Sequence, residues 1–145
     1  MAENNIIYFM KYNSQIFRNM QSYIDRVLEK YELSSGTYSY LLNIYFNEGT
    51  TQSRVGNEIG HDKAMSARTI KKLIEQGFIY KESDREDSRL HHIFLTEKGK
   101  NSAPKVKEEV ESLSLLLTED VDDSEKEILM KNMEKIFLKM MELKE

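Results

Sequence analysis

The residues with the clearest chemistry are two arginines, Arg85 and Arg89, which stand among three carboxylates in a short polar run. Arginine on a projecting loop can enter the narrow minor groove of DNA, where the potential is most negative. A neighbouring carboxylate fixes the direction of such a guanidinium, and Asp87 is spaced to do this for Arg89. The alternative is a solvated charged turn that prevents pairing at the edge of a sheet.

Basic residues continue N-terminal to this run, on a segment with helical periodicity. The pattern predicts a helix from about Asp62 to Gln76, with Gly77 as its C-cap. At 100° per residue, the face expected to pack inward comprises Ser66, Ala67, Ile70, Leu73 and Ile74. The opposite face and the first turn, expected to contact bases and phosphates, comprise Lys63, Ala64, Met65, Arg68, Thr69 and Lys72. The alternative is an ordinary solvated helix face.

These residues need elements that present them to a groove. Before the basic helix, Thr50 or Thr51 caps a short helix that ends at Gly60. A short helix, a turn and a longer helix form a helix-turn-helix, which places its second helix in the major groove. Three residues at the start of the short helix are also expected to bind DNA, namely Thr51, Gln52 and Ser53.

After the basic helix the pattern changes to that of strands. Residues 78–80 are apolar and predict a strand, residues 83–89 are polar and predict a loop, and residues 90–95 predict a second strand. The segment is therefore a hairpin with a charged tip. The tip residues assigned to DNA binding are Arg85, Asp87, Ser88 and Arg89.

Helices are predicted on both sides of this block. Apolar residues recur at helical spacing over residues 6–31, and Ser34 or Ser35 begins a second helix that ends near Asn47.

Two more helices follow the hairpin. Thr96 begins a long one that ends near Leu117, and Pro104 is expected to kink it, or to restart it with Ser102 as the new cap. A capping box of Ser124 and Glu127 opens the last helix.

The predicted fold class is mostly α with a small β-hairpin wing. One domain over residues 1–145 would hold a winged helix-turn-helix lobe, 33–99, and a helical dimerisation region formed by 1–32 and 100–145. The apolar stripes of the terminal helices are long for this chain, and pairing with a second copy about a two-fold axis would bury them. A homodimer of this kind needs a near-palindromic double-stranded site with half-site centres about 10 bp apart.

The block from Leu33 to Gly99 resembles the MarR family of bacterial regulators, without gaps. The pattern T-Q-S-x-[VL]-x-x-x-[IL]-G is matched by Thr51, Gln52, Ser53, Val55, Ile59 and Gly60. The pattern D-K-A-x-x-x-R-x-[IV]-x-x-L-x-x-x-G-[FL]-I is matched by Asp62, Lys63, Ala64, Arg68, Ile70, Leu73, Gly77, Phe78 and Ile79. The wing pattern D-x-x-D-x-R, followed by L-T-E-K-G, is matched by Asp84, Asp87, Arg89, Leu95, Thr96, Glu97, Lys98 and Gly99.

The resemblance implies a transcriptional regulator, with repression as the family default. It implies that Arg68 acts from the recognition helix and Arg89 from the wing, and that the first helix and the last two form the dimer. It also implies a small aromatic effector bound between the dimer helices and the lobe. Several aromatic and methionine side chains of the first two helices suit such a pocket, although core and interface packing is the favoured interpretation of any single one: Tyr8, Met10, Tyr12, Met20, Tyr38 and Tyr40.

The chain departs from the family pattern at four positions. Ser66 stands where a branched apolar residue is usual, Ser88 where a second arginine is frequent and Arg85 where proline is common, and Pro104 is unusual in its helix.

Composition argues against several other classes. The net charge is −4, and only the segment from His61 to Lys100 is basic, with 9 basic and 7 acidic residues. No cysteine, glycine-rich phosphate loop or nucleophile elbow is present, so an enzyme and a cofactor are not expected. His91 and His92 should point to opposite faces of a strand, which disfavours a metal site. Acidic residues at 119–123 precede a helix start, where its dipole favours them over a cation site.

Two further expectations concern location and the second function class. No apolar run reaches the length of a membrane span, and the N-terminus lacks the features of a secretory signal, so the cytoplasm is expected. A winged helix used only for protein interaction is the alternative to DNA binding. Its contact face would be apolar where this one carries Arg68 and Lys72.

Overall fold

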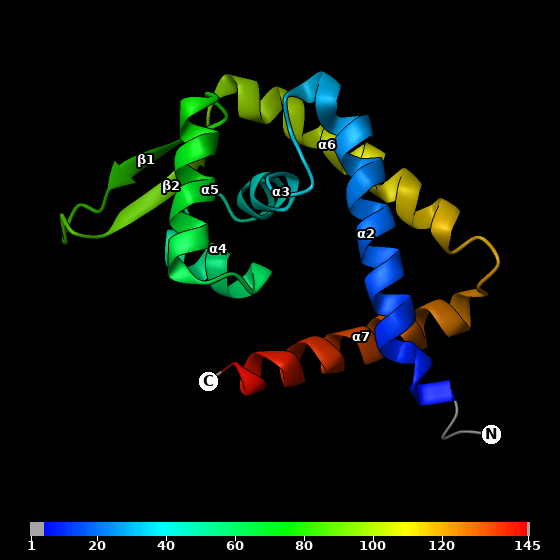
Figure 1. Cartoon of the computed structure of the whole chain (residues 1–145). Coiled ribbons are helices and arrows are strands. Elements are labelled where there is room, and N and C mark those ends of the chain that lie inside the picture. The colour runs from blue at the N-terminus through cyan, green and yellow to red at the C-terminus, as the bar shows by residue number, and fades with distance from the viewer. Residues whose placement is uncertain (1–4, 145) are drawn as a thin grey trace. The chain divides into compact units, whose positions relative to one another are not determined.

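A computed structural model describes residues 5–144, which form helices and one antiparallel hairpin (Figure 1). The elements are α2 (Tyr8–Leu28), η1 (Glu29–Tyr31), α3 (Tyr38–Phe46), α4 (Gln52–Ile59), α5 (Lys63–Glu75), β1 (Ile79–Ser83), β2 (His91–Leu95), α6 (Glu97–Leu117) and α7 (Asp123–Leu143). The predicted class, mostly α with a small hairpin, is confirmed. The chain divides into two compact units, and the boundary between them falls between Lys107 and Glu108. Within residues 5–144, no helix has the length and apolar character needed to cross a membrane.

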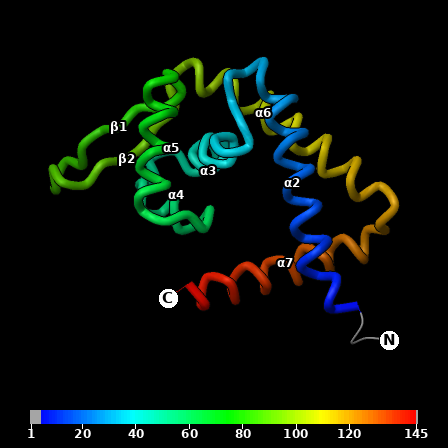
Figure 2. Tube along the Cα trace, in the orientation of Figure 1, coloured from blue at the N-terminus to red at the C-terminus, as the bar shows by residue number. Residues whose placement is uncertain are grey.

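The core of the first unit is centred on α3. Tyr40, Leu41 and Ile44 of this helix are fully buried. Their neighbours in the core include Val55 of α4, Ile70 and Leu73 of α5, and Phe78 and Ile93 at the hairpin. In the trace of Figure 2, α3, α4 and α5 pack together, and the hairpin extends away from them. The helices therefore form a base from which the hairpin projects.

Side-chain caps begin both α4 and α5, that of α4 at Thr51 as predicted. The Thr51 hydroxyl accepts a hydrogen bond from the Arg54 amide at 3.3 Å, and an Asp62 carboxylate oxygen accepts one from the Met65 amide at 2.8 Å. Gly60 ends α4 with a φ of 84°, a left-handed conformation that glycine adopts without strain. The two helices thus match the prediction to within one residue.

The hairpin is a longer ribbon than predicted. β1 runs to Ser83 and β2 begins at His91, whereas the prediction ended the first strand at residue 80 and began the second at 90. The extra β1 residues are polar and exposed, so hydrophobicity does not mark them. Ile93 also pairs with Thr50 in an isolated bridge, which joins the ribbon to the turn before α4.

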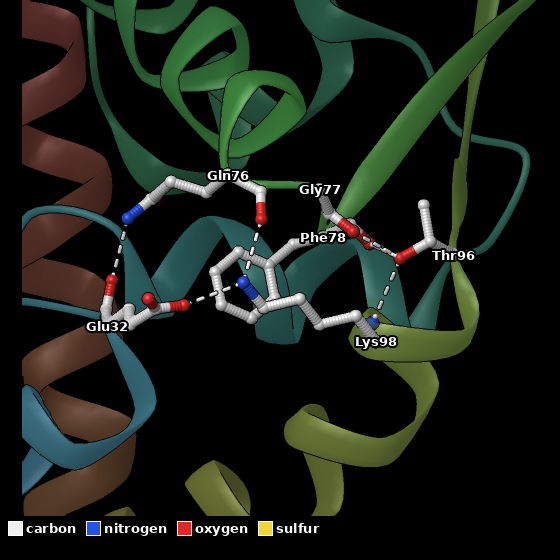
Figure 3. A network of polar contacts seen from close by, with 7 residues as sticks. Glu32, Gln76, Gly77, Phe78, Thr96 and Lys98 are labelled. Carbon is white, nitrogen blue, oxygen red and sulfur yellow. Dashed lines mark hydrogen bonds and ion pairs between the residues drawn. The ribbon is translucent and has the colours of Figure 1, made fainter.

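The T-E-K-G segment at the base of the hairpin is structural (Figure 3). The Lys98 ammonium donates hydrogen bonds to the Glu32 carboxylate at 2.7 Å and to the Gln76 carbonyl at 2.8 Å. It also lies 4.4 Å from the centre of the Phe78 ring, within cation–π range. One side chain therefore joins the ends of η1, α5 and the first residue of the hairpin.

The same junction needs a threonine and a glycine. The Thr96 hydroxyl accepts a hydrogen bond from the Gly99 amide at 3.1 Å and donates to the carbonyl of Gly77, so Thr96 caps α6 as predicted. A Cβ at Gly99 would overlap the Phe78 carbonyl oxygen. Only glycine lets α6 start so close to the hairpin.

The end of the first helix and the start of the second differ from prediction. The first α-helix ends at Leu28 and continues as the 3₁₀ turn η1, which Glu32 ends with a left-handed φ of 62°. The second begins at Tyr38 instead of after Ser34 or Ser35, because residues 34–37 form a turn in which the Ser34 amide donates to the Thr37 hydroxyl at 3.0 Å.

The last two helices also correct the prediction. The capping box of α7 is Asp122 with Glu125, two residues before the expected Ser124 and Glu127. Aspartate caps as well as serine, and this choice lengthens the helix. α6 continues through Pro104, so a restart capped by Ser102 is wrong.

Apolar side chains in the terminal helices are exposed. In the N-terminal half of α2 they include Met10, Ile16 and Phe17. α7 has no buried residue, and its exposed apolar side chains are Ile128, Leu129, Met130, Met133, Ile136, Phe137, Leu138, Met140 and Leu143.

Candidate nucleic-acid interface

The second helix of the helix-turn-helix, α5, divides into a buried and an exposed face. Its buried residues are Ser66, Thr69, Ile70 and Leu73, at the spacing of one helix face. Lys63, Ala64, Met65, Arg68 and Lys72 are exposed, as predicted.

The predicted phase of α5 was wrong at three residues. Thr69 is only 9% exposed, and its hydroxyl donates to the Met65 carbonyl at 3.0 Å. Ala67 and Ile74, expected inside, are exposed. The reason is that a threonine hydroxyl satisfied by its own helix can be buried, whereas the prediction placed buried positions by apolar character alone.

Two exposed basic residues were missing from the predicted set. Lys71 lies three residues after Arg68 and seven after Ala64, so it shares the centre of the exposed face. Arg54 is exposed on α4 and pairs with Glu58 at 3.2 Å. The correct helical phase, anchored on Ser66 and Leu73, would have identified Lys71.

The turn between α4 and α5 is held by a close approach of the two helices. A Cβ at Gly56 would overlap the Ser66 hydroxyl and lie 3.1 Å from the Ser66 Cβ. The buried Tyr40 hydroxyl donates to the Ser66 hydroxyl at 3.3 Å and lies 2.7 Å from His61 Nδ1. Ser66, which departs from the family pattern, therefore fits because it is small enough to approach Gly56 and accepts the hydrogen bond from Tyr40. Tyr40 itself belongs to the core.

A polar cleft of about 300 Å³ opens between α4 and α5. Its lining residues are Gln52, Ser53, Gly56, Asn57, His61, Lys63 and Ser66. Gln52 also accepts a hydrogen bond from the Lys81 ammonium at 3.1 Å, which links the start of α4 to β1. The cleft thus brings the predicted residues Gln52, Ser53 and Lys63 together.

The hairpin tip carries Arg89 in a defined local geometry. Asp87 Oδ1 accepts from the Arg89 backbone amide at 3.0 Å and from its Nε at 3.3 Å, as the spacing predicts, although through a single oxygen. The Arg89 side chain is still 90% exposed. Arg85 and Ser88 are exposed beside it. The tip therefore presents a directed guanidinium to its surroundings.

The entrance of the tip loop is organised by Asp84. Its Oδ1 accepts from the Glu86 and Asp87 amides at 2.8 and 3.1 Å, and its Oδ2 pairs with His92 Nε2 at 2.8 Å. These hydrogen bonds, first of all that with His92, lower the pKa of Asp84 to about 2. His92 Nδ1 lies 2.8 Å from the carbonyl oxygen of Gly49.

These contacts give His92, one of the two neighbouring histidines of β2, a structural role. His92 is engaged by Asp84 and Gly49, and His91 is exposed. Within residues 5–144, no three His, Cys, Asp or Glu side chains are grouped so that they would hold a metal ion.

Comparison with known proteins agrees with this geometry. Residues 31–90 match the MarR family. The chain is 34% identical over 114 residues to the uncharacterized HTH-type transcriptional regulator YybA of Bacillus subtilis strain 168, a match covering 79% of this chain and 76% of YybA. The crystal structure of the transcriptional regulator SlyA superposes with a TM-score of 0.88 at 28% identity, over 92% of this chain and 94% of SlyA.

A protein solved on DNA shares the fold. The MepR–DNA complex of S. aureus superposes with a TM-score of 0.83 at 19% identity, covering 91% of this chain and 97% of MepR. The helix-turn-helix, the wing and these similarities define a winged helix-turn-helix transcriptional regulator. The chain belongs to the MarR family.

Proposed function

We propose that this regulator binds double-stranded DNA sequence-specifically, with α5 in the major groove and the wing tip in the adjacent minor groove. The observation that carries the proposal is the pairing of an exposed basic face on α5 with an exposed arginine that Asp87 directs at the wing tip. The MepR structure, a DNA complex with the same fold, supports it.

Each part of the surface would have its own role. Arg68 and Met65 face base edges from α5, and Arg89 reads the narrow minor groove. Phosphate contacts, which position the protein without reading sequence, fall to the remaining polar and basic residues: Thr51, Gln52, Ser53, Lys63, Lys71, Lys72, Arg85 and Ser88. Ala64, exposed in the first turn of α5, remains part of the proposed surface. Thr69 leaves the set because it is buried.

We further propose a homodimer formed by the terminal helices. Large apolar side chains exposed on α7, such as Leu129 and Phe137, and on the N-terminal half of α2, such as Phe17, support this, because a second copy would bury them. A two-fold dimer presents two recognition helices, so the bound site should be a near-palindrome with half-site centres about 10 bp apart.

Repression is the proposed regulatory outcome, with modulation by a small aromatic effector as part of the proposal. A protein that occupies DNA at a promoter excludes other proteins from the same site. Exposed aromatic side chains of α2, Tyr8 and Tyr12, support the effector. A reporter carrying the selected site should fall in output when the protein is expressed, and an effector should restore it.

Selection of bound sequences from random duplex DNA, followed by a salt titration, tests DNA binding. Binding should fall steeply with salt, with a slope of roughly −0.9 in log K against log salt for each phosphate that a lysine or arginine neutralises. A flat salt response would instead favour the protein-interaction class. The exposed face of α5 argues against that class, because Lys63, Arg68 and Lys71 give it a cationic character.

A further inference from the structure

His92 contacts two groups that can only accept hydrogen bonds. Its Nδ1 lies 2.8 Å from the backbone carbonyl oxygen of Gly49, and its Nε2 lies 2.8 Å from Oδ2 of Asp84. A neutral imidazole has one N–H donor and one acceptor nitrogen, so it would leave one of these contacts without a proton. Only the imidazolium, with a proton on both nitrogens, donates to both. The contacts therefore select the charged form of His92.

Asp84 is a carboxylate, not a carboxylic acid, in this arrangement. Its other oxygen already accepts two backbone amide hydrogen bonds, from Glu86 and Asp87, which stabilise the ionised form. Hydrogen bonds to Asp84 and Gly49 correspondingly raise the pKa of His92 above its ordinary value of 6.5.

The two acceptors belong to different parts of the interface. Gly49 lies in the turn just before α4, where its amide also donates to the Ile93 carbonyl at 2.8 Å. Asp84 begins the tip loop and fixes the amide of Asp87, which in turn directs Arg89. A chain of hydrogen bonds thus leads from the helix-turn-helix through His92 to the wing arginine.

The surrounding charges favour a cation at this position. Carboxylates near the ring come from β1 and the tip loop, namely Glu82, which is the cross-strand partner of His92, together with Asp84 and Glu86. Glu48 stands next to Gly49 on the helix-turn-helix side and accepts from the Leu95 amide at 3.1 Å. Arg85 is the basic residue that lines the same recess, opposing these carboxylates.

We propose that His92 is a positioning residue of the wing, which as an imidazolium ties the tip loop to the turn before α4 and so aims Arg89. This rests on the proposed DNA binding. Because the folded-state pKa of His92 is raised, the clamp is complete below about pH 6.5 and is lost as pH rises through the folded-state pKa. DNA affinity should follow the same course.

The first experiment needs no DNA. Nitrogen-15 NMR of the full chain should show both ring nitrogens of His92 protonated at pH 6.5, and a titration midpoint above the ordinary histidine value of 6.5. In the Asp84→Asn variant the midpoint of His92 should fall toward that ordinary value. A neutral His92 ring at pH 6.5, or a midpoint unchanged by Asp84→Asn, would overturn the clamp whatever the protein does with DNA.

The second experiment measures affinity for the selected duplex from pH 6 to pH 8.5 at fixed salt. Wild-type affinity should fall roughly tenfold across this range, as expected when one good groove contact is lost. His92→Gln should show a flat profile, and the matched control His91→Gln should keep the wild-type profile. A His92→Gln profile that parallels wild type overturns the positioning role. Absence of any specific binding overturns the proposed function instead, and the NMR result still decides the clamp.

Discussion

The helix-turn-helix lobe buries most of its large apolar side chains within one chain, whereas α7 buries none of its own. In the lobe, Tyr40, Ile70 and Phe78 have no exposed surface at all. In α7, Phe137 is 39% exposed and Met130 is 65% exposed. Helices in both regions carry large apolar side chains, so the difference lies in whether neighbouring elements of the same chain cover them.

This difference separates two sources of stability. The position of α5 and of the wing is held by contacts within residues 32–99, among them the Gly56–Ser66 approach and the Lys98 junction. The terminal helices leave apolar side chains exposed, and the proposed second copy would bury them. Mutations in the lobe should therefore act on folding or on single DNA contacts, and mutations in α7 should act on assembly.

Removal of residues 124–145 should have the largest effect on DNA binding. Without α7 the apolar partner surface is lost, and the protein should become a monomer or aggregate. Affinity for the full site should fall by roughly 100-fold or more, because the two half-sites would no longer be bound as one unit. Sedimentation and a DNA titration measure both quantities.

A point variant separates assembly from simple loss of chain. Phe137→Glu places a charge on an exposed position of α7 and should weaken the dimer while leaving the melting of the lobe intact. A truncated protein that remains a soluble dimer and binds the full site normally would show that α7 is not the dimer element.

Gly56→Val should have the largest effect on the lobe itself. The added side chain overlaps Ser66, and overpacking of this kind costs about 3 kcal/mol of unfolding free energy. Ser66→Ala should recover part of that loss, because it removes the hydroxyl that lies nearest. Asn57→Ala, at the exposed next position of α4, is the control and should be nearly neutral in thermal or urea unfolding. Equal stability of Gly56→Val and wild type would contradict the close approach.

Arg68→Ala and Arg89→Ala should each weaken specific DNA binding by about 1–3 kcal/mol and leave folding nearly unchanged. Both side chains are exposed, so little packing is lost. Lys105→Ala, which removes an exposed charge from α6, is the matched control and should have little effect in the same titration. Wild-type affinity in both arginine variants would show that the groove assignment is wrong.

Lys98→Met should give the smallest effect, about 1 kcal/mol of unfolding free energy, because its ion pair with Glu32 is partly exposed. Most of the loss should come from the Gln76 carbonyl and the Phe78 ring. Lys100→Met is the control, since its ammonium lies 3.9 Å from Glu97 in an exposed pair. If Lys98→Met and Lys100→Met have the same melting temperature, the Lys98 junction contributes nothing measurable to stability.

Sequence reasoning predicted the order of elements and most of the candidate surface. Caps at Thr51, Asp62 and Thr96 are local signals, since each depends on a side chain and an amide three residues away. The motif residues Lys98 and Gly99 were matched by pattern alone, and their structural role is visible only when Gln76 and Phe78 are brought beside them.

The errors arose where distant neighbours decide burial. Thr69 satisfies its hydroxyl within α5 and is buried, although a polar residue is expected outside. The polar end of β1 forms a strand because residues 91–93 pair with it, which its own composition does not indicate. The local sequence around His92 does not indicate its contact with Gly49, because the two residues are 43 positions apart.

The division of α5 into two faces also sets the rules for redesigning what this regulator reads. Four positions of the helix, Ser66, Thr69, Ile70 and Leu73, are committed to the core and should stay constant in any library. The exposed positions that a library can vary are Ala64, Met65, Ala67, Arg68 and Lys71. Because these side chains contribute little to the packing of the lobe, altered recognition should be selectable without a parallel search for compensating stability.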